Sequence, residues 1–171
     1  MAALTLGEQL DQLISDEDIL YGECFFNVAH GWYRKDSAGE VILINSAIDN
    51  SFRRNYAKGH ELGHHFTGYR EHDTFDKSLS ARRAEHRADQ WALLTWFMPM
   101  EKLIAAYEYG ARTPFELVDY LGIPVEEFYR GLEMYFSKFG HTSYFGQYVI
   151  TWSPFNIKLD KRRKTEVANR I

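Results

Sequence analysis

The residues best able to do chemistry form one short run, His60-Glu61-Leu62-Gly63-His64. On a helix, positions 60 and 64 lie one turn apart on the same face, so both imidazoles can bind one Zn²⁺ ion from the same side. Glu61 lies on the adjacent column of the helix, where its carboxylate can reach a metal-bound water. Zn²⁺ lowers the pKa of such a water toward about 7, and Glu61 would take its proton as the oxygen attacks a carbonyl carbon.

A zinc site that catalyses a reaction needs a third protein ligand and an open coordination position. The best candidate is Glu85, on the next long helix, which antiparallel packing would bring close to His60 and His64. Asp89 follows Glu85 by one helical turn, so its carboxylate can accept the second N–H of a zinc-bound imidazole and fix the tautomer. The alternative is a solvated helix face on which both carboxylates pair with neighbouring arginines, Arg82, Arg83 and Arg87.

Three other histidines and one cysteine compete as ligands. His65 and His86 each directly follow a candidate ligand, so they point about 100° away around the helix and are expected to serve in packing. His72 belongs to the predicted connecting loop and stays open as a ligand. Cys24 has no partner at metal-ligand spacing and is expected to be a buried thiol.

Composition and charge exclude several other classes of protein. The chain has 171 residues, of which 45% are hydrophobic, and its net charge of −4 is not that of a protein that binds nucleic acid. A single cysteine excludes a disulfide scaffold and fits a reducing compartment. No stretch approaches the roughly 20 apolar residues that span a membrane, and residues 1–33 contain no Lys or Arg for a signal peptide. These features predict a cytoplasmic protein.

The elements before the two histidines include a short helix and a β hairpin. Thr5 and Glu8 have the spacing of a capping box, followed by apolar residues at helical period. Aromatic and β-branched side chains are frequent in residues 25–33 and 41–44, and turn-forming residues lie between the two segments. This pattern predicts a hairpin.

Two long helices are predicted to carry the candidate ligands. The first begins at a cap on Asp49 or Asn50, continues to about Phe66, and ends with Gly68 as a left-handed C-cap. A polar loop then leads to a second helix over residues 79–97.

The last third of the chain is predicted to be mainly helical. Thr113 and Glu116 form a second capping box, with proline at the first helical position, and Pro124 begins another helix that runs to about Lys138. The chain after Gly140 is aromatic and resembles strands.

Together these elements predict an α+β fold. We expect a small zincin-like domain in which a β hairpin or sheet packs on the helix of the two histidines and on the second ligand-bearing helix, with a helical C-terminal third. A single zinc metallopeptidase domain is expected over residues 1–140, with its zinc core at about 25–100 and a helical pair at about 100–140. Residues 141–171 are expected to form an extension of unknown role.

The order of these motifs resembles that of the ImmA/IrrE family of metallopeptidases, which occur on bacterial mobile elements, in prophages and in stress-response loci. The similarity covers roughly residues 25–135 and rests on four groups: Gly31-Trp32-Tyr33 with Val41 to Asn45, His60 to His64, Glu85-x-x-Ala88-Asp89-x-Trp91-Ala92 with Met98-Pro99, and Leu121-Gly122-Ile123-Pro124-Val125. The gap from Trp91 to Pro99 is one residue longer than in the family pattern, and the chain after Gly140 has no counterpart.

The resemblance implies that His60, His64 and Glu85 are the zinc ligands and that Glu61 is the catalytic base. It further implies a zinc-dependent endopeptidase that cleaves a helix-turn-helix transcriptional repressor by attack of a zinc-bound water. A basic repressor would also suit the acidic residues 1–33, which carry six carboxylates and no base. Opposite charge would raise the rate of encounter.

Two other functions stay open. One is a non-catalytic zinc-binding partner protein that sequesters a repressor. The other is DNA binding, because residues 114–136 imitate a helix-turn-helix, but its second helix carries Glu126, Glu127 and Glu133, which phosphates would repel. We therefore expect no direct contact with nucleic acid, and we interpret the basic run at residues 161–164 as a solvated chain end.

Overall fold

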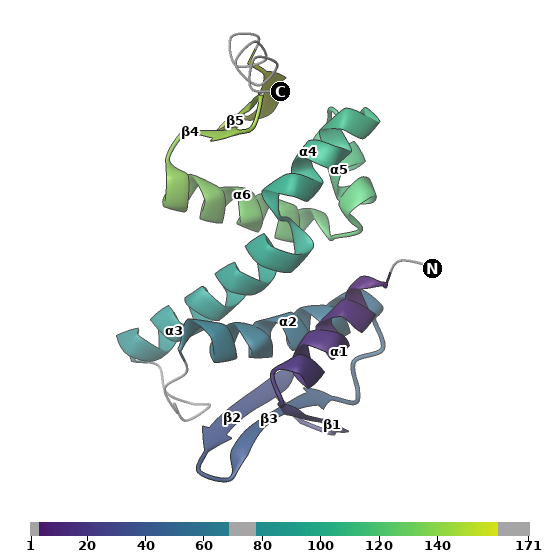
Figure 1. Ribbon diagram of the computed structural model, residues 1–171, viewed down its shortest axis with the longest axis vertical. Helices are drawn as coiled ribbons and strands as arrows, with labels where there is room; N and C mark the ends of the chain where they lie inside the picture. The colour runs from purple at the N-terminus through teal and green to yellow at the C-terminus, as the bar shows by residue number, and fades with distance from the viewer. Residues whose placement is uncertain (1–3, 69–77, 161–171) are drawn as a thin grey trace. The chain divides into compact units, whose positions relative to one another are not determined.

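The computed structural model describes residues 4–68 and 78–160 and shows a mixed α+β protein (Figure 1), which confirms the coarse fold class. The chain divides into two compact units, residues 1–96 and 97–171. The described part of the first unit contains α1 (Leu6–Asp16), β1 (Leu20–Cys24), β2 (Gly31–Asp36), β3 (Gly39–Asn45), α2 (Ser51–Thr67) and α3 (Leu79–Ala92). The predicted loop with His72 and the basic run at residues 161–164 lie outside the described residues.

The strands of the first unit form a sheet in the order β1-β3-β2. β2 and β3 make the predicted hairpin, with Tyr33 opposite Ile42, and β1 adds in parallel to the other edge of β3. Two details of the prediction are wrong. The first strand of the hairpin begins at Gly31 rather than at Phe25, and β1 is a strand that the sequence did not predict.

The buried side chain of Asn45, at the end of β3, explains why the hairpin begins late. Its Nδ2 donates hydrogen bonds to the carbonyl oxygens of Phe26 and Ala29, at 2.9 and 2.8 Å, and its Oδ1 accepts one from the N–H of Phe26 at 3.3 Å. A side-chain amide thus satisfies backbone groups that a neighbouring strand would otherwise take. Residues 25–30 therefore form a loop that leads into β2.

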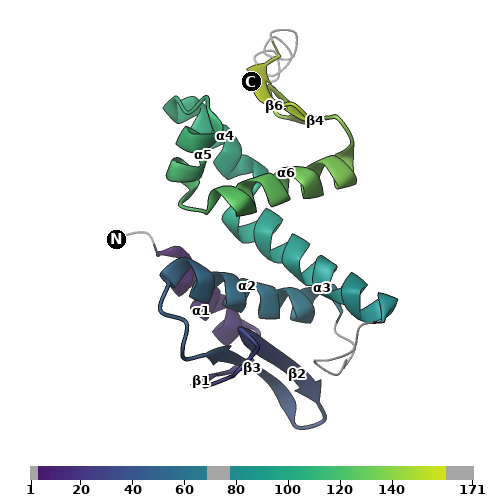
Figure 2. The same cartoon turned by 180° about the vertical axis from the view of Figure 1, so that it is seen from behind.

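Helices α1 and α2 lie on one face of this sheet (Figures 1 and 2). The predicted capping box of Thr5 and Glu8 opens α1, and Asn50 caps α2. Gly68 ends α2 with φ 85° and ψ 93°, a positive φ that lies outside the left-handed helical region predicted for it. The core between helices and sheet is apolar and includes Leu10, Ile14, Tyr33, Ile42, Ile44 and Leu62.

Helix α3 ends at Ala92 and continues as a short π-helix, η1 (Leu93–Phe97), where the sequence predicted one α-helix to residue 97. Each i→i+5 hydrogen bond of a π-helix encloses one residue more than an α-helical bond. The chain therefore continues past Ala92 in a wider turn than the predicted α-helix would have.

The described part of the second unit contains α4 (Met100–Tyr109), α5 (Pro114–Leu121), α6 (Val125–Phe139), β4 (Thr142–Phe145), β5 (Tyr148–Trp152) and β6 (Phe155–Leu159). The predicted capping box of Thr113 and Glu116 opens α5, and α6 begins after Pro124 as expected. The strand character after Gly140 is confirmed, because β4, β5 and β6 form an antiparallel sheet in that order. Nowhere in residues 4–68 and 78–160 does a helix combine the length and apolar character needed to cross a membrane.

The second sheet packs on α6 through aromatic side chains. Tyr135 stacks on Trp152, with ring centroids 4.2 Å apart and 9° between the ring planes. The Tyr135 hydroxyl donates to the carbonyl oxygen of Met98 and the Trp152 Nε1 donates to Ser143 Oγ, both at 2.8 Å. This sheet belongs to the same compact unit as α4–α6. The functional extents of a peptidase domain over residues 1–140 and of an extension over 141–171 stay predictions.

Candidate metal centre

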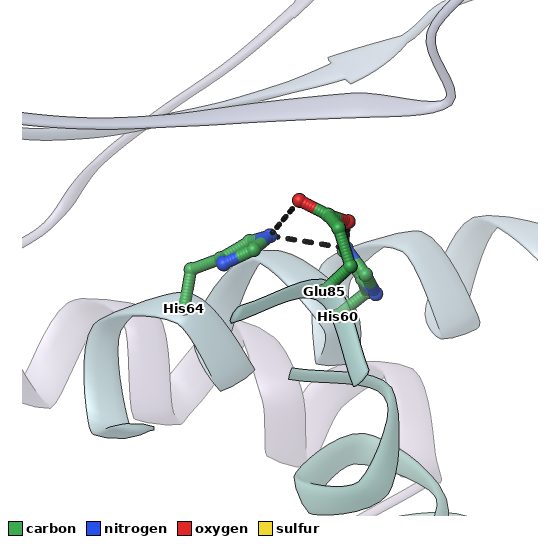
Figure 3. A group of neighbouring side chains, drawn as sticks. All are labelled: His60, His64 and Glu85. Atoms are coloured by element: carbon green, nitrogen blue, oxygen red, sulfur yellow. Dashed lines mark hydrogen bonds and ion pairs between the residues drawn. The ribbon is translucent and has the colours of Figure 1, made fainter. Parts of the chain in front are cut away.

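His60 and His64 project from α2, and Glu85 points toward them from α3 (Figure 3). One ligand atom from each residue lies within 4.8 Å of the other two, an arrangement that can hold a metal ion. The fold therefore brings together two histidines one helical turn apart and a carboxylate from the next long helix, as the sequence predicted.

The shortest contacts within this group are close to the ligand spacing of a tetrahedral ion, and Glu85 makes its two contacts through different carboxylate oxygens. Nε2 of His60 lies 3.1 Å from Nε2 of His64 and 3.1 Å from Oε2 of Glu85, and Nε2 of His64 lies 3.5 Å from Oε1 of Glu85. Metal–ligand bonds of about 2.0–2.1 Å place neighbouring ligand atoms of a tetrahedron about 3.3–3.4 Å apart. Three protein ligands would occupy one face of the tetrahedron and leave the fourth position open.

Asp89 contacts the other nitrogen of His60. Nδ1 of His60 donates to Oδ1 of Asp89 at 2.9 Å, and the hydroxyl of Tyr56 donates to the same oxygen at 3.1 Å. This contact leaves Nε2 of His60 to face His64 and Glu85. Sequence reasoning missed Tyr56, although it precedes His60 by one helical turn and so shares its face.

Glu61 is only 6% exposed and lies against strand β2. The backbone N–H of Tyr33 donates to its carboxylate, which lies where a side chain at Gly31 would begin. Burial raises the pKa of Glu61 to about 7, against the opposing effect of His60 and His64. A carboxyl group with such a pKa can accept a proton in one step and return it in the next. No local spacing predicts these strand contacts, because they depend on how the sheet packs on α2.

Charged hydrogen bonds join the residues of the ligand group. Burial disfavours a charged imidazole, but the hydrogen bonds to Asp89 and Glu85 raise the pKa of His60 to about 10. The hydrogen bonds with His60 and His64 hold the pKa of Glu85 well below its usual range. A metal ion that replaced the proton on His60 would meet ligand atoms already close to their binding positions.

A close approach of α2 and α3 brings Glu85 to the histidines. A Cβ at Gly63 would lie 2.5 Å from the carbonyl oxygen of Ala88 and 2.8 Å from its Cα, so only glycine fits there. Small residues also form the buried stripe of α3: Ala81, Ala84, Ala88 and Ala92. The rings of Phe66 and Trp91 stack between the two helices, with centroids 4.9 Å apart.

The other sequence candidates lie apart from this group. Nδ1 of His65 lies 2.5 Å from Oε2 of Glu40 and Nε2 lies 3.3 Å from Oε2 of Glu17, so His65 links α2 to the hairpin and to α1. His86 is exposed on α3, and Cys24 is half-buried rather than fully buried as expected. None of the three belongs to the metal-ligand group found among the described residues.

No protein-family model matches the chain, and no curated protein matches it. The resemblance to the ImmA/IrrE metallopeptidases therefore rests on the motifs of this sequence alone.

We expect Gly63→Ala to weaken both the fold and metal binding. The new methyl group would meet the backbone of α3, so the helices must separate at a cost of about 1–3 kcal/mol, and Glu85 would move away from the histidines. Thermal melts and titration with Zn²⁺ measure the two effects. Gly7→Ala is the matched control, since the nearest atoms to its methyl group would belong to the side chain of Asn55, at 3.1 Å, and not to a backbone. Equal Zn²⁺ affinity for Gly63→Ala and wild type would contradict this account.

Zn²⁺ affinity should also rise with pH. Because the pKa of His60 in the metal-free protein is about 10, Zn²⁺ must displace a proton throughout the neutral range. We expect an increase of about tenfold per pH unit between about pH 6 and about pH 8, with release of about one proton measured by calorimetry in two buffers. Without metal, the raised pKa stabilises the fold fully below about pH 6.5, and this contribution is lost as pH rises through about 10. An affinity independent of pH would contradict the ligand role of His60.

Proposed function

We propose that this protein is a zinc-dependent endopeptidase with a zincin-like fold, related to the ImmA/IrrE metallopeptidases. The observation that carries the proposal is the triangle of His60, His64 and Glu85 with the buried carboxylate of Glu61 beside it. Two imidazoles one turn apart, a carboxylate ligand from a second helix and a carboxylate base form the combination of groups with which zinc peptidases hydrolyse peptide bonds.

The donor set favours zinc. Two imidazole nitrogens and one carboxylate oxygen suit Zn²⁺, whose catalytic sites commonly have three protein ligands. When bound, zinc would supply a water of lowered pKa and would polarise the carbonyl group of the scissile peptide. Asp89 would keep the proton on Nδ1 of His60, so that Nε2 is the ligand atom.

Glu61 acts first as a general base and then as a general acid. Its carboxylate takes a proton from the attacking water and passes that proton to the amine nitrogen as the C–N bond breaks. Burial favours a proton on this carboxyl group, and the N–H of Tyr33 holds the carboxylate in one orientation.

Strand β2 offers a binding edge for the backbone of a substrate. The N–H of Asn45 donates to the carbonyl oxygen of His30 at 2.9 Å, and Gly31 lies opposite Ile44. Because the direction of hydrogen bonding alternates along an antiparallel strand, Gly31 and Lys35 direct their N–H and C=O groups away from β3. Within the described chain β2 is an outer strand of its sheet, and such edges pair with extended peptides. This edge supports a polypeptide substrate.

The substrate we propose is a helix-turn-helix repressor, cleaved in the cytoplasm. The acidic residues 1–33 would attract a basic protein less strongly than their six carboxylates suggest. Two of them pair with basic side chains of the same unit, Asp11 with Lys58 at 2.5 Å and Glu23 with Arg54 at 2.9 Å, and Glu17 contacts Nε2 of His65 at 3.3 Å. Recognition of a repressor would therefore also draw on other surfaces, such as the edge of β2.

We expect Glu61→Gln to keep the fold and the zinc but to lose about 10²–10⁴-fold in peptidase activity. The amide has nearly the same shape as the carboxylate and cannot take a proton from water. Wild type and Glu61→Gln would be expressed separately in the same host strain. New protein N-termini in each culture would then be identified by mass spectrometry. Wild type should generate N-termini within a repressor that Glu61→Gln does not, while elemental analysis finds about one zinc per chain in both.

Three other results would each change the proposal. Equal cleavage by both variants would exclude Glu61 as the base. Relief of repression by both variants without cleavage would identify a non-catalytic zinc-binding partner that sequesters the repressor. Cleavage only of proteins that lack a helix-turn-helix would retain the peptidase and reject the proposed substrate.

A further inference from the structure

The side chain of Glu61 occupies the space in which a side chain at position 31 would lie. A Cβ at Gly31 would be 2.6 Å from Oε1, 2.9 Å from Cγ and 3.1 Å from Cδ of Glu61. Ordinary van der Waals contacts between such atoms are about 3.5–4.0 Å. No residue larger than glycine therefore fits at position 31 while Glu61 keeps its place.

The conformation of the backbone does not account for this glycine. Among the described residues, positive φ angles occur at Asp18 and at six glycines, Gly39, Gly68, Gly110, Gly122, Gly140 and Gly146, and Gly31 is not one of them. Gly31 begins strand β2 opposite Ile44, in regular antiparallel pairing. Glycine weakens a strand, because it adds conformational entropy to the unfolded chain and has no side chain to pack. The contact with Glu61 is the feature that requires it.

A second group of the same strand holds the carboxylate. Tyr33 is two residues further along β2, on the same face of the sheet, and its N–H donates to the carboxylate of Glu61. The strand is anchored there, because the side chain of Tyr33 is 2% exposed and its hydroxyl donates to Oε2 of Glu40 at 2.5 Å. Gly31 provides the space and Tyr33 the hydrogen bond, so one strand sets both the position and the orientation of the carboxylate.

We propose that Gly31 is a positioning residue, whose missing side chain leaves the space that holds the carboxylate of Glu61 beside the metal centre. The proposal rests on the proposed role of Glu61 as the base, and Gly31 acts only through Glu61. With alanine at position 31, either the carboxylate leaves its place and loses the N–H of Tyr33, or β2 shifts away from α2. Both changes cost stability, and both displace the base.

A double-mutant cycle of thermal stability tests the contact without any substrate. The full chain is melted as wild type, Gly31→Ala, Glu61→Ala and the double variant, each with a chelator and again with Zn²⁺. Gly31→Ala should lower the melting temperature by roughly 3–10 °C in the wild-type background, because overpacking is costly. In the Glu61→Ala background the same change should cost less than half as much, because the clashing side chain and its hydrogen bond are already absent.

Gly22→Ala in strand β1 is the matched control. Its methyl group would meet only the end of the Leu43 side chain, at 3.0 Å, so its cost should be the same with and without Glu61. A Gly31→Ala variant that fails to fold, with a double variant that folds, would support the proposal. An equal cost in both backgrounds, no cost in either, or two variants that both fail to fold would overturn it.

The functional readout separates a positioning role from a purely structural one. Gly31→Ala should keep about one zinc per chain and lose the new N-termini in repressors, as Glu61→Gln does, whereas Gly22→Ala should keep both. Full cleavage by Gly31→Ala would overturn the positioning role. If the wild type cleaves nothing, the proposed peptidase function fails, and the stability cycle still decides whether Gly31 holds Glu61.

Discussion

The close approach of α2 and α3 at Gly63 is the constraint on which the rest of the site depends. A glycine inside a helix costs on the order of 1 kcal/mol relative to alanine, and here it lets the backbone of Ala88 come into direct contact with α2. Only at that separation does Glu85 reach the histidines, with ligand atoms 3.1 to 3.5 Å apart. On the other side of α2, Gly31 allows a second close approach, in which β2 lies directly on Glu61. The absence of a side chain at Gly31 and at Gly63 thus sets how closely β2 and α3 approach the turn of α2 that carries Glu61 and the two histidines.

Burial and charge then determine the pKa values of the ionisable residues on this turn of α2. His64 and Glu61 are each 6% exposed, so the site must compensate for the lost hydration of several ionisable groups. Asp89 and Glu85 do so by hydrogen bonding to His60, which raises its pKa, while burial raises the pKa of Glu61. The same contacts place an imidazole nitrogen of His60 toward the other ligands and keep a proton acceptor beside them. The same contacts that compensate the buried charges therefore also present the ligand atoms that could hold a metal ion.

Features encoded by local spacing could be predicted from the sequence, and features that depend on tertiary packing could not. Helical periodicity predicts the turn that joins His60 to His64 and the position of Glu85 on the next helix. The residue types at the helix starts predict the caps at Thr5 and Asn50. Strand β1 could not be predicted, because its parallel partner β3 is separated from it in the sequence by the whole of β2. The π-helix after Ala92 also escaped prediction, since its residues favour an α-helix equally well. The contacts of Gly31 and Tyr33 with Glu61 depend on how the sheet packs on α2, and no local sequence pattern predicts this packing.

A crystal structure of the full chain with Zn²⁺, measured with anomalous diffraction at the zinc edge, tests the central claim most directly. Crystals should be grown near pH 8 without a chelator, because protonated imidazoles do not bind metal. We expect one zinc ion bound by Nε2 of His60, Nε2 of His64 and a carboxylate oxygen of Glu85, with bonds of about 2.0–2.2 Å and a fourth position not occupied by protein. Zinc at another place in the chain, or bound to the two histidines with a third protein ligand other than Glu85, would contradict the account.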